Sequence, residues 1–197
     1  MTHTRSRSRS TVNRARKAEV PSTLPDLLVP GLDLVFVGIN PGETSARLGH
    51  YYANRGNAFW SLLAGSPLVS RGVRPEDDAA LAQATPLRIG FTDVVKRVET
   101  DSSKVETIEI REAAAGFRAR VALATPRAVC FTGARQFDVL FPGERGAWGH
   151  QSVDLDGAEV WVIPSTSGRA VAYRGEIAPI LEDLAAALGV QRTEVPR

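Results

Sequence analysis

The chain has 197 residues, of which 43% are hydrophobic and 23% charged, and its formal net charge is +2 at pH 7. This apolar content is enough for one well-filled core, and no linker rich in Pro, Gly or Ser divides the sequence after residue 25. No run of 18 apolar residues and no apolar signal segment in the first 20 residues is present, so we expect a cytoplasmic protein without a membrane span. Three histidines and one cysteine, spread along the chain, do not make a zinc or iron–sulfur site, so no metal or cofactor is expected.

Residues 1–22 are predicted to be a disordered basic tail, followed by one domain over residues 23–197. Six Arg and Lys residues against one Glu give residues 1–20 a charge of +5, which leaves −3 for the rest of the chain. The tail should therefore attract DNA phosphates without regard to base sequence. A mitochondrial presequence is the alternative, although a tail without leucines would make a poor amphipathic helix.

The first predicted strand covers residues 34–37 and runs into the turn Gly38-Ile-Asn-Pro-Gly42. Glycine and proline let a backbone turn tightly and approach a ligand, and ligands of open α/β sheets bind at the carboxyl ends of strands. The turn presents one carboxamide, Asn40, which can orient a water molecule without carrying a charge. A turn with a purely structural role is the alternative.

The second predicted strand covers residues 88–91 and ends shortly before Asp93. At the carboxyl end of a strand, a carboxylate could activate water or stabilise positive charge on a sugar. The alternative is a structural role, in which Asp93 caps a helix or turn or forms an ion pair with Lys96 or Arg97.

Strands and helices continue to alternate along the rest of the chain. Apolar residues at helical spacing predict long helices over residues 108–123 and 174–188. A hairpin is predicted from strands 151–155 and 159–163, because Asp156-Gly157 between them is a good turn signal. The other predicted elements are helices over residues 57–64, 75–84 and 134–140 and a strand over residues 128–132.

This alternation predicts the α/β class, with a single three-layer α/β/α domain around a mostly parallel sheet. Cys130 lies in the apolar run of strand 128–132, so we expect it to be a buried small hydrophobe and not a nucleophile. A second polar loop, Pro164-Ser-Thr-Ser-Gly-Arg169, follows strand 159–163. We expect this loop to lie beside the turn that carries Asn40.

Four spaced parts of the chain together resemble a known family. They are Gly38-Ile-Asn-Pro-Gly42, Gly49-His-Tyr-Tyr52 with Gly56-Asn-Ala-Phe-Trp60, Gly90-Phe-Thr-Asp-Val-Val-Lys-Arg97, and Ile163-Pro-Ser-Thr-Ser-Gly-Arg169. Over roughly residues 25–188 the chain is similar to the mismatch-specific uracil-DNA glycosylase and thymine-DNA glycosylase family, whose Gly-Ile-Asn-Pro-Gly motif it matches without change. The last part is closer to the Met-Pro-Ser-Ser-Ser-Ala-Arg of thymine-DNA glycosylases than to the bacterial mismatch-specific pattern, which implies a less apolar wedge.

The resemblance implies a uracil-DNA glycosylase-like fold and a repair activity. The enzyme would flip uracil, or another mismatched or damaged base, out of DNA and hydrolyse its N-glycosidic bond, leaving an abasic site for base excision repair. Asn40 would position the water and Asp93, an asparagine in thymine-DNA glycosylases, would assist catalysis. The implied contacts are Gly38, Ile39, Ser45 and Tyr52 with the base, and Ser165, Ser167, Gly168 and Arg169 with the DNA.

Two of these residues have specific expected roles and structural alternatives. Tyr52 would stack on the flipped base, which contributes about 1 to 3 kcal/mol per base, or else it is a core aromatic. Backbone N–H groups around Ile39 and Tyr52 would face the pyrimidine carbonyls. Arg169 would enter the duplex near the widowed base, or else it is a solvated charge at the entry of a helix.

The expected partner is double-stranded DNA that contains uracil or a mismatch, bound by a monomer, with single-stranded DNA as a second candidate. Two other functions remain open from the sequence. One is a catalytically weak protein that binds abasic or mismatched DNA. The other is a hydrolase of small nucleosides or nucleotides, which would need no duplex wedge.

Overall fold

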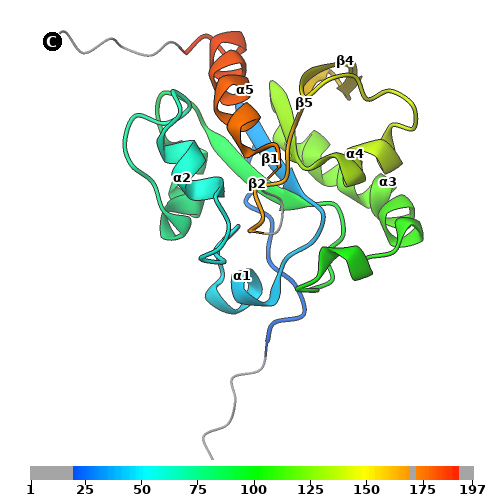
Figure 1. The fold of residues 1–197 in the computed structure, drawn as a ribbon. Coiled ribbons are helices and arrows are strands. Elements are labelled where there is room, and N and C mark those ends of the chain that lie inside the picture. The colour runs from blue at the N-terminus through cyan, green and yellow to red at the C-terminus, as the bar shows by residue number, and fades with distance from the viewer. Residues whose placement is uncertain (1–19, 169–171, 191–197) are drawn as a thin grey trace, which may run out of the picture.

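A five-stranded sheet forms the centre of the fold. The computed structural model describes residues 20–168 and 172–190 (Figure 1). In spatial order the strands are β2 (Ile89–Asp93), β1 (Leu34–Gly38), β3 (Ala128–Thr132), β5 (Ala158–Ile163) and β4 (Gly149–Leu155). The first four are parallel, and β4 runs antiparallel to β5. The carboxyl ends of the four parallel strands therefore meet at one edge, where open α/β sheets bind their ligands.

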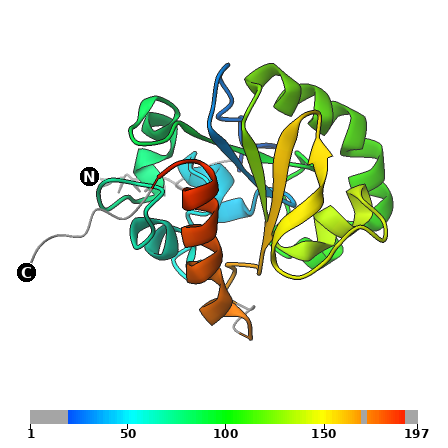
Figure 2. The same ribbon diagram turned by 90° about the horizontal axis from the view of Figure 1, so that it is seen from above.

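Helices cover both faces of the sheet. They are α1 (Glu43–Leu48), α2 (Phe59–Ala64), α3 (Thr107–Ala124), α4 (Ala134–Leu140) and α5 (Arg174–Ala187), with two 3-10 helices, η1 (Pro75–Gln83) and η2 (Ser102–Lys104). Figure 2 shows α5 on one side of the sheet and α3 on the other. This three-layer arrangement around a mostly parallel sheet confirms the predicted fold class.

The side chains of β1 explain why two layers of helices are needed. Leu34 and Phe36 belong to one core cluster with residues of α2 and α5, whereas Val35 and Val37 belong to a second cluster with residues of α3 and α4. Successive residues of a strand point to opposite faces of the sheet. A central parallel strand is covered on both faces, so its sequence is apolar throughout.

Several predicted elements agree closely with the structure. The predicted bounds of β3 and α4 match those observed, and α3 and α5 agree to within one residue at each end. The hairpin between β4 and β5 is also confirmed. Asp156 and Gly157 have φ of +54° and +90°, as a two-residue turn between twisted strands requires.

Other elements differ from the prediction. Helix α2 begins two residues later than predicted, because Asn57 Oδ1 accepts the N–H of Phe59 at 2.9 Å and the chain turns there. The segment predicted as a helix over residues 75–84 is the 3-10 helix η1. Helix α1 was not predicted, since six residues are too few to show helical periodicity. Strand β2 continues through Asp93, which places this carboxylate in the strand itself.

Most of the predicted basic tail lies outside the described residues, so its disorder and its boundary with the domain stay predictions. Within the described part, Leu24 is already buried, and Leu27 pairs with Phe91 beside the sheet. No helix within residues 20–168 and 172–190 has the length and apolar character to cross a membrane.

Candidate active site

A cavity of about 370 Å³ lies at the carboxyl edge of the sheet. The last residues of three neighbouring parallel strands line it, namely Gly38 of β1, Asp93 of β2 and Thr132 of β3. The loops after β1 and β5 both contribute to its walls. The two polar loops therefore meet at one cavity, as the sequence predicts.

The side chain of Asn40 is held in one orientation by backbone carbonyls. Its Nδ2 donates to Glu99 O at 2.7 Å, to Pro41 O at 3.1 Å and to Arg97 O at 3.4 Å. Because carbonyl oxygens only accept, these contacts fix the NH₂ group on their side and Oδ1 on the other. Oδ1 is buried, and no described residue hydrogen-bonds to it. A buried acceptor without a partner costs about 1 to 3 kcal/mol, so this oxygen is suited to a bound water or to a ligand N–H.

Asp93 is a buried carboxyl group at the cavity, with only 3% of its surface exposed. Burial is the main reason that its pKa rises from 3.8 to about 7; Lys96 and Arg120 lower the pKa, and the Asp26 carboxylate raises it. Its Oδ2 is buried and has no hydrogen-bond partner among the described residues. A carboxyl group with a pKa near neutrality is suited to proton transfer.

The alternative in which Asp93 forms an ion pair with Lys96 or Arg97 is wrong. Lys96 Nζ contacts Asp26 Oδ1 at 2.7 Å, and Arg97 Nε contacts Glu109 Oε2 at 2.9 Å. Both basic residues follow the end of β2 and find other carboxylates outside the strand. Asp93, as the last residue of that strand, lies instead against Gly38 and the cavity.

Asp26 links the end of β2 to α3 next to the cavity. Thr92 Oγ1 donates to Asp26 Oδ1 at 2.7 Å. Arg120 Nε of α3 lies 2.8 Å from Asp26 Oδ2, an ion pair whose angle is not that of a hydrogen bond. Arg120 Nη2 also donates to Asp93 O at 2.9 Å. These contacts fix the backbone at Asp93 without engaging its carboxyl group.

Tyr52 lines the cavity with an unusual backbone conformation, φ +52°. A positive φ outside glycine is uncommon and gathers at functional sites. The ring stacks on Phe59 with 4.1 Å between centroids, so the core packing expected in the alternative is present. Tyr52 OH lies 3.1 Å from Thr132 Oγ1, and Thr132 itself donates to Val37 O at 3.2 Å. A hydroxyl has one hydrogen, so Tyr52 is the donor to Thr132, and burial keeps the pKa of Tyr52 well above its ordinary value.

Three other residues predicted to bind the base, Gly38, Ile39 and Ser45, also line the cavity. Ser45 is buried, and its Oγ accepts the N–H of Ala53 at 3.1 Å, which ties α1 to the segment that carries Tyr52. Ile39 O accepts the N–H of Val95 at 2.8 Å. The contacts of these residues with a base stay predictions.

The loop after β5 brings Ser165, Ser167 and Gly168 to the cavity, whereas Arg169 lies outside the described residues. Ser165 Oγ accepts the N–H of Ser167 at 3.3 Å. A Cβ on Gly168 would lie 2.8 Å from Gly56 O, so only glycine permits this approach of two backbones. The loop after β5 is thereby packed against the segment that precedes α2.

Several residues of the cavity wall were not among the predicted site residues, and two parts of the wall are instructive. Thr132 is the last residue of a parallel strand, as Asp93 is. The rule that ligands bind at the carboxyl ends of such strands could therefore have identified it. Residues 99–102 bring Glu99 and Asp101 to the rim, and no spacing in the sequence indicates that this segment folds back onto Asn40.

The remaining reactive groups are the Cys130 thiol and the side chains that could bind a metal ion. Cys130 is buried as predicted, and burial raises the pKa of its thiol. Across residues 20–168 and 172–190, no group of three or more His, Cys, Asp and Glu side chains is arranged to hold a metal ion.

The chain is similar to known proteins in sequence and in fold. The family model of the uracil DNA glycosylase superfamily matches residues 25–185. The chain is also similar to the solution NMR structure of a "putative Uracil DNA glycosylase" from Methanosarcina acetivorans, at 22% sequence identity and a TM-score of 0.52. That match covers 82% of this chain and 96% of the other. At this level of identity the likeness concerns the fold.

Proposed function

The chain belongs to the uracil DNA glycosylase superfamily, and from this premise we propose that it is a monofunctional glycosylase that excises uracil and other mismatched or damaged bases from DNA. We place it with the mismatch-specific and thymine-DNA glycosylases because the turn after β1 reads Gly-Ile-Asn-Pro-Gly. One observation carries the proposal. A single cavity is lined by Asn40 and Asp93, and each has a buried oxygen that no described residue hydrogen-bonds.

These two oxygens supply what hydrolysis of an N-glycosidic bond requires. Asn40 Oδ1 accepts a hydrogen bond from the attacking water, and the Asp93 carboxylate takes the proton that the water loses as its oxygen bonds to C1′ of the sugar. The C1′–N bond breaks, and its electron pair leaves with the base. Backbone N–H groups around Ile39 and Tyr52 stabilise the anionic base until it gains a proton. The products are the free base and an abasic site.

The cavity receives the flipped base. Its volume of about 370 Å³ lies within the range of about 300 to 1,000 Å³ usual for sites that bind small molecules. Tyr52 stacks on the face of the base, while Gly38, Ile39 and Ser45 contact its edges. A small-molecule nucleoside hydrolase could use the same groups, but it would need no wedge that enters a duplex.

The loop after β5 contacts the DNA beside the flipped nucleotide. Ser165, Ser167 and Gly168 offer hydroxyl and backbone N–H donors to the phosphates, and Arg169 enters the space that the base has left. The basic tail adds a sequence-independent attraction to the duplex. In this proposal the enzyme acts as a monomer in the cytoplasm on double-stranded DNA.

The experiment that tests the proposal uses an end-labelled duplex with one uracil opposite guanine, followed by cleavage of abasic sites with alkali. We expect cleavage at the uracil and none in the matched duplex with cytosine at that position. A protein that binds an abasic duplex but releases no uracil under enzyme excess would instead support the weak-binder alternative. Cleavage of free deoxyuridine but not of the duplex would support the nucleoside hydrolase.

A further inference from the structure

The orientation of Asn40 depends on the backbone of one loop, residues 97–101. Two of the three carbonyls that accept from Asn40 Nδ2 belong to this loop, Arg97 O at 3.4 Å and Glu99 O at 2.7 Å. If the loop moved, the NH₂ group would lose two of its three acceptors, and the direction of Oδ1 would be less firmly fixed. The orientation of the Asn40 amide therefore depends on where these two carbonyls lie.

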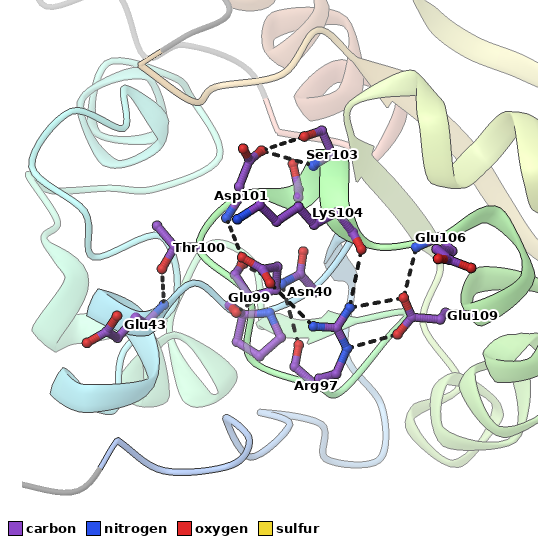
Figure 3. Close-up of polar contacts among 12 residues, drawn as sticks. Asn40, Glu43, Arg97, Glu99, Thr100, Asp101, Ser103, Lys104, Glu106 and Glu109 are labelled. Carbon is purple, nitrogen blue, oxygen red and sulfur yellow. Dashed lines mark hydrogen bonds and ion pairs between the residues drawn. The ribbon is translucent and has the colours of Figure 1, made fainter.

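The side chain of Arg97 fixes the loop to the start of α3, as Figure 3 shows. Its Nε donates to Glu109 Oε2 at 2.9 Å and its Nη2 to Glu109 Oε1 at 3.0 Å, a two-bond fork. Nη2 also reaches Lys104 O at 3.5 Å, and Nη1 lies 3.5 Å from Glu99 Oε2. One guanidinium thus connects the loop, through Arg97 itself and Glu99, to Lys104 and to Glu109 of α3.

Glu109 is itself held in place at the first turn of α3. Its Oε1 accepts the N–H of Glu106 at 2.8 Å, which completes a capping box. The hydrogen bond from Arg97 and then that from the Glu106 N–H lower the pKa of Glu109 to about 2. The carboxylate is therefore ionised at neutral pH and anchored to a regular element, so it is a fixed point to which a loop can be tied.

The exposure of the pair argues against a main role in global stability. The side chain of Arg97 is 46% exposed and that of Glu109 is 29% exposed. Exposed ion pairs contribute little to the free energy of unfolding. A well-formed fork at such a position has its main effect on the local geometry of the loop.

We infer that Arg97 and Glu109 are positioning residues that act through Asn40, by holding the carbonyls of Arg97 and Glu99 against its amide. This inference rests on the proposed role of Asn40 in the reaction. Neither Arg97 nor Glu109 lines the cavity. Their effect appears in the rate of the chemical step, because a displacement of about 1 Å in a catalytic group can reduce that rate by about 10²-fold.

The chain contains a matched control pair. Arg71 Nη2 contacts Asp77 Oδ1 at 3.1 Å, and Asp77 belongs to the capping box of η1 as Glu109 belongs to that of α3. The Arg71 side chain is 61% exposed, and neither residue lines the cavity. Arg71→Ala therefore removes the arginine partner of a capping-box carboxylate and leaves the loop of residues 97–101 unchanged.

The test is a double-mutant cycle on the single-turnover rate of uracil excision. We expect Arg97→Ala to lower this rate by roughly 10-fold or more, with little change in affinity for an abasic duplex or in melting temperature. Glu109→Gln should lower it less, and Arg71→Ala should leave it unchanged. In an Asn40→Ala background, Arg97→Ala should add almost nothing, because the group through which it acts is gone. An equal fractional loss in both backgrounds, or none in either, would overturn the inference.

A second readout does not depend on activity. The side-chain amide of Asn40 gives a ¹⁵N–¹H NMR signal that is assigned by its disappearance in Asn40→Ala. We expect slow exchange with solvent in wild type, faster exchange in Arg97→Ala and an intermediate rate in Glu109→Gln, which also serves if Arg97→Ala does not fold. If neither variant perturbs the signal, the positioning role of Arg97 and Glu109 is refuted, even in an active enzyme. If the signal is perturbed in a protein without glycosylase activity, the positioning role is upheld and the proposed function is refuted.

Discussion

Gly38 and Asp93 face each other across β1 and β2 at a separation that only glycine allows. The two residues are register partners in the parallel pair, and a Cβ on Gly38 would lie 2.2 Å from Asp93 Oδ1. The hydroxyl of Tyr52 would lie only 3.5 Å from the same Cβ. The missing side chain at Gly38 therefore gives the Asp93 carboxyl group its place beside the cavity.

The first prediction is that Gly38→Ala displaces Asp93 and reduces excision. A contact of 2.2 Å requires the carboxyl group or the strand to shift, and a displaced catalytic group can cost about 10²-fold in rate. The single-turnover rate should fall toward that of Asp93→Ala. Gly72→Ala, a position where a Cβ meets nothing within 4 Å, is the control and should keep the wild-type rate. Full activity in Gly38→Ala would mean that the position of Asp93 is unimportant.

The second prediction concerns stability and pH. The folded-state pKa of Asp93, about 7, lies above its ordinary value of 3.8. Between these pH values the folded protein binds more protons than the unfolded chain, so this group lowers stability progressively as pH rises from about 4 to about 7. Asparagine cannot ionise. The stability of Asp93→Asn relative to wild type should therefore increase by roughly 2 to 3 kcal/mol between pH 5 and pH 8, at about 1.4 kcal/mol per pKa unit.

Urea unfolding of both proteins at the two pH values measures this difference. A stability difference that does not change with pH would show that Asp93 does not titrate in this range. A pKa near neutrality would then no longer support its role as a base.

The sequence predicted the fold class and the polar ends of two strands because these features follow from local patterns. The apolar β1 run and the Gly-Ile-Asn-Pro-Gly turn identify Asn40 by position alone. The environment of Asp93 could not be predicted in this way. Its burial depends on Gly38 in the neighbouring strand, and its expected partner Lys96 is held by Asp26, which is 70 residues away in the chain.

The contacts that orient Asn40 were beyond reach of the sequence for a similar reason. Two of the three are made by backbone carbonyls of residues 57 and 59 positions away, and any residue type supplies a carbonyl. Helix α1 was missed because it is short, and the positive φ of Tyr52 has no signal in its residue type. Local sequence patterns thus identify the reactive residues, and long-range packing determines how these residues are arranged.

The third prediction concerns the basic tail. Deletion of residues 1–20, which carry a charge of +5, should weaken binding to any duplex and make binding less sensitive to salt. Each phosphate contact that is lost lowers the slope of log affinity against log salt by roughly 0.9. Titrations at several salt concentrations measure the slope. A deletion that changes which base is excised while leaving the slope intact would contradict this electrostatic account.

The fourth prediction concerns the range of substrates. Unstacking a base costs a few kcal/mol and costs least in a mismatch or a single strand, and the polar loop after β5 offers little that reads the opposite base. Uracil should be removed fastest opposite guanine, detectably opposite adenine, and to some extent from single strands. Arg169→Ala should slow duplex substrates more than single-stranded ones. Activity confined to uracil opposite guanine, with equal effects of Arg169→Ala on all substrates, would refute this prediction.

The central claim is that Asn40 and Asp93 act together on one water molecule, and the single-turnover rate of uracil excision as a function of pH tests it most directly. In wild type the rate should rise through about pH 7, where Asp93 loses its proton, and then level off. Asp93→Asn should lower the rate by roughly 10² or more and remove the rise, while Asn40→Ala should remove most activity, keep the rise, and leave affinity for an abasic duplex nearly intact. Wild-type rates in both variants, or a rise near pH 7 that persists in Asp93→Asn, would contradict the claim.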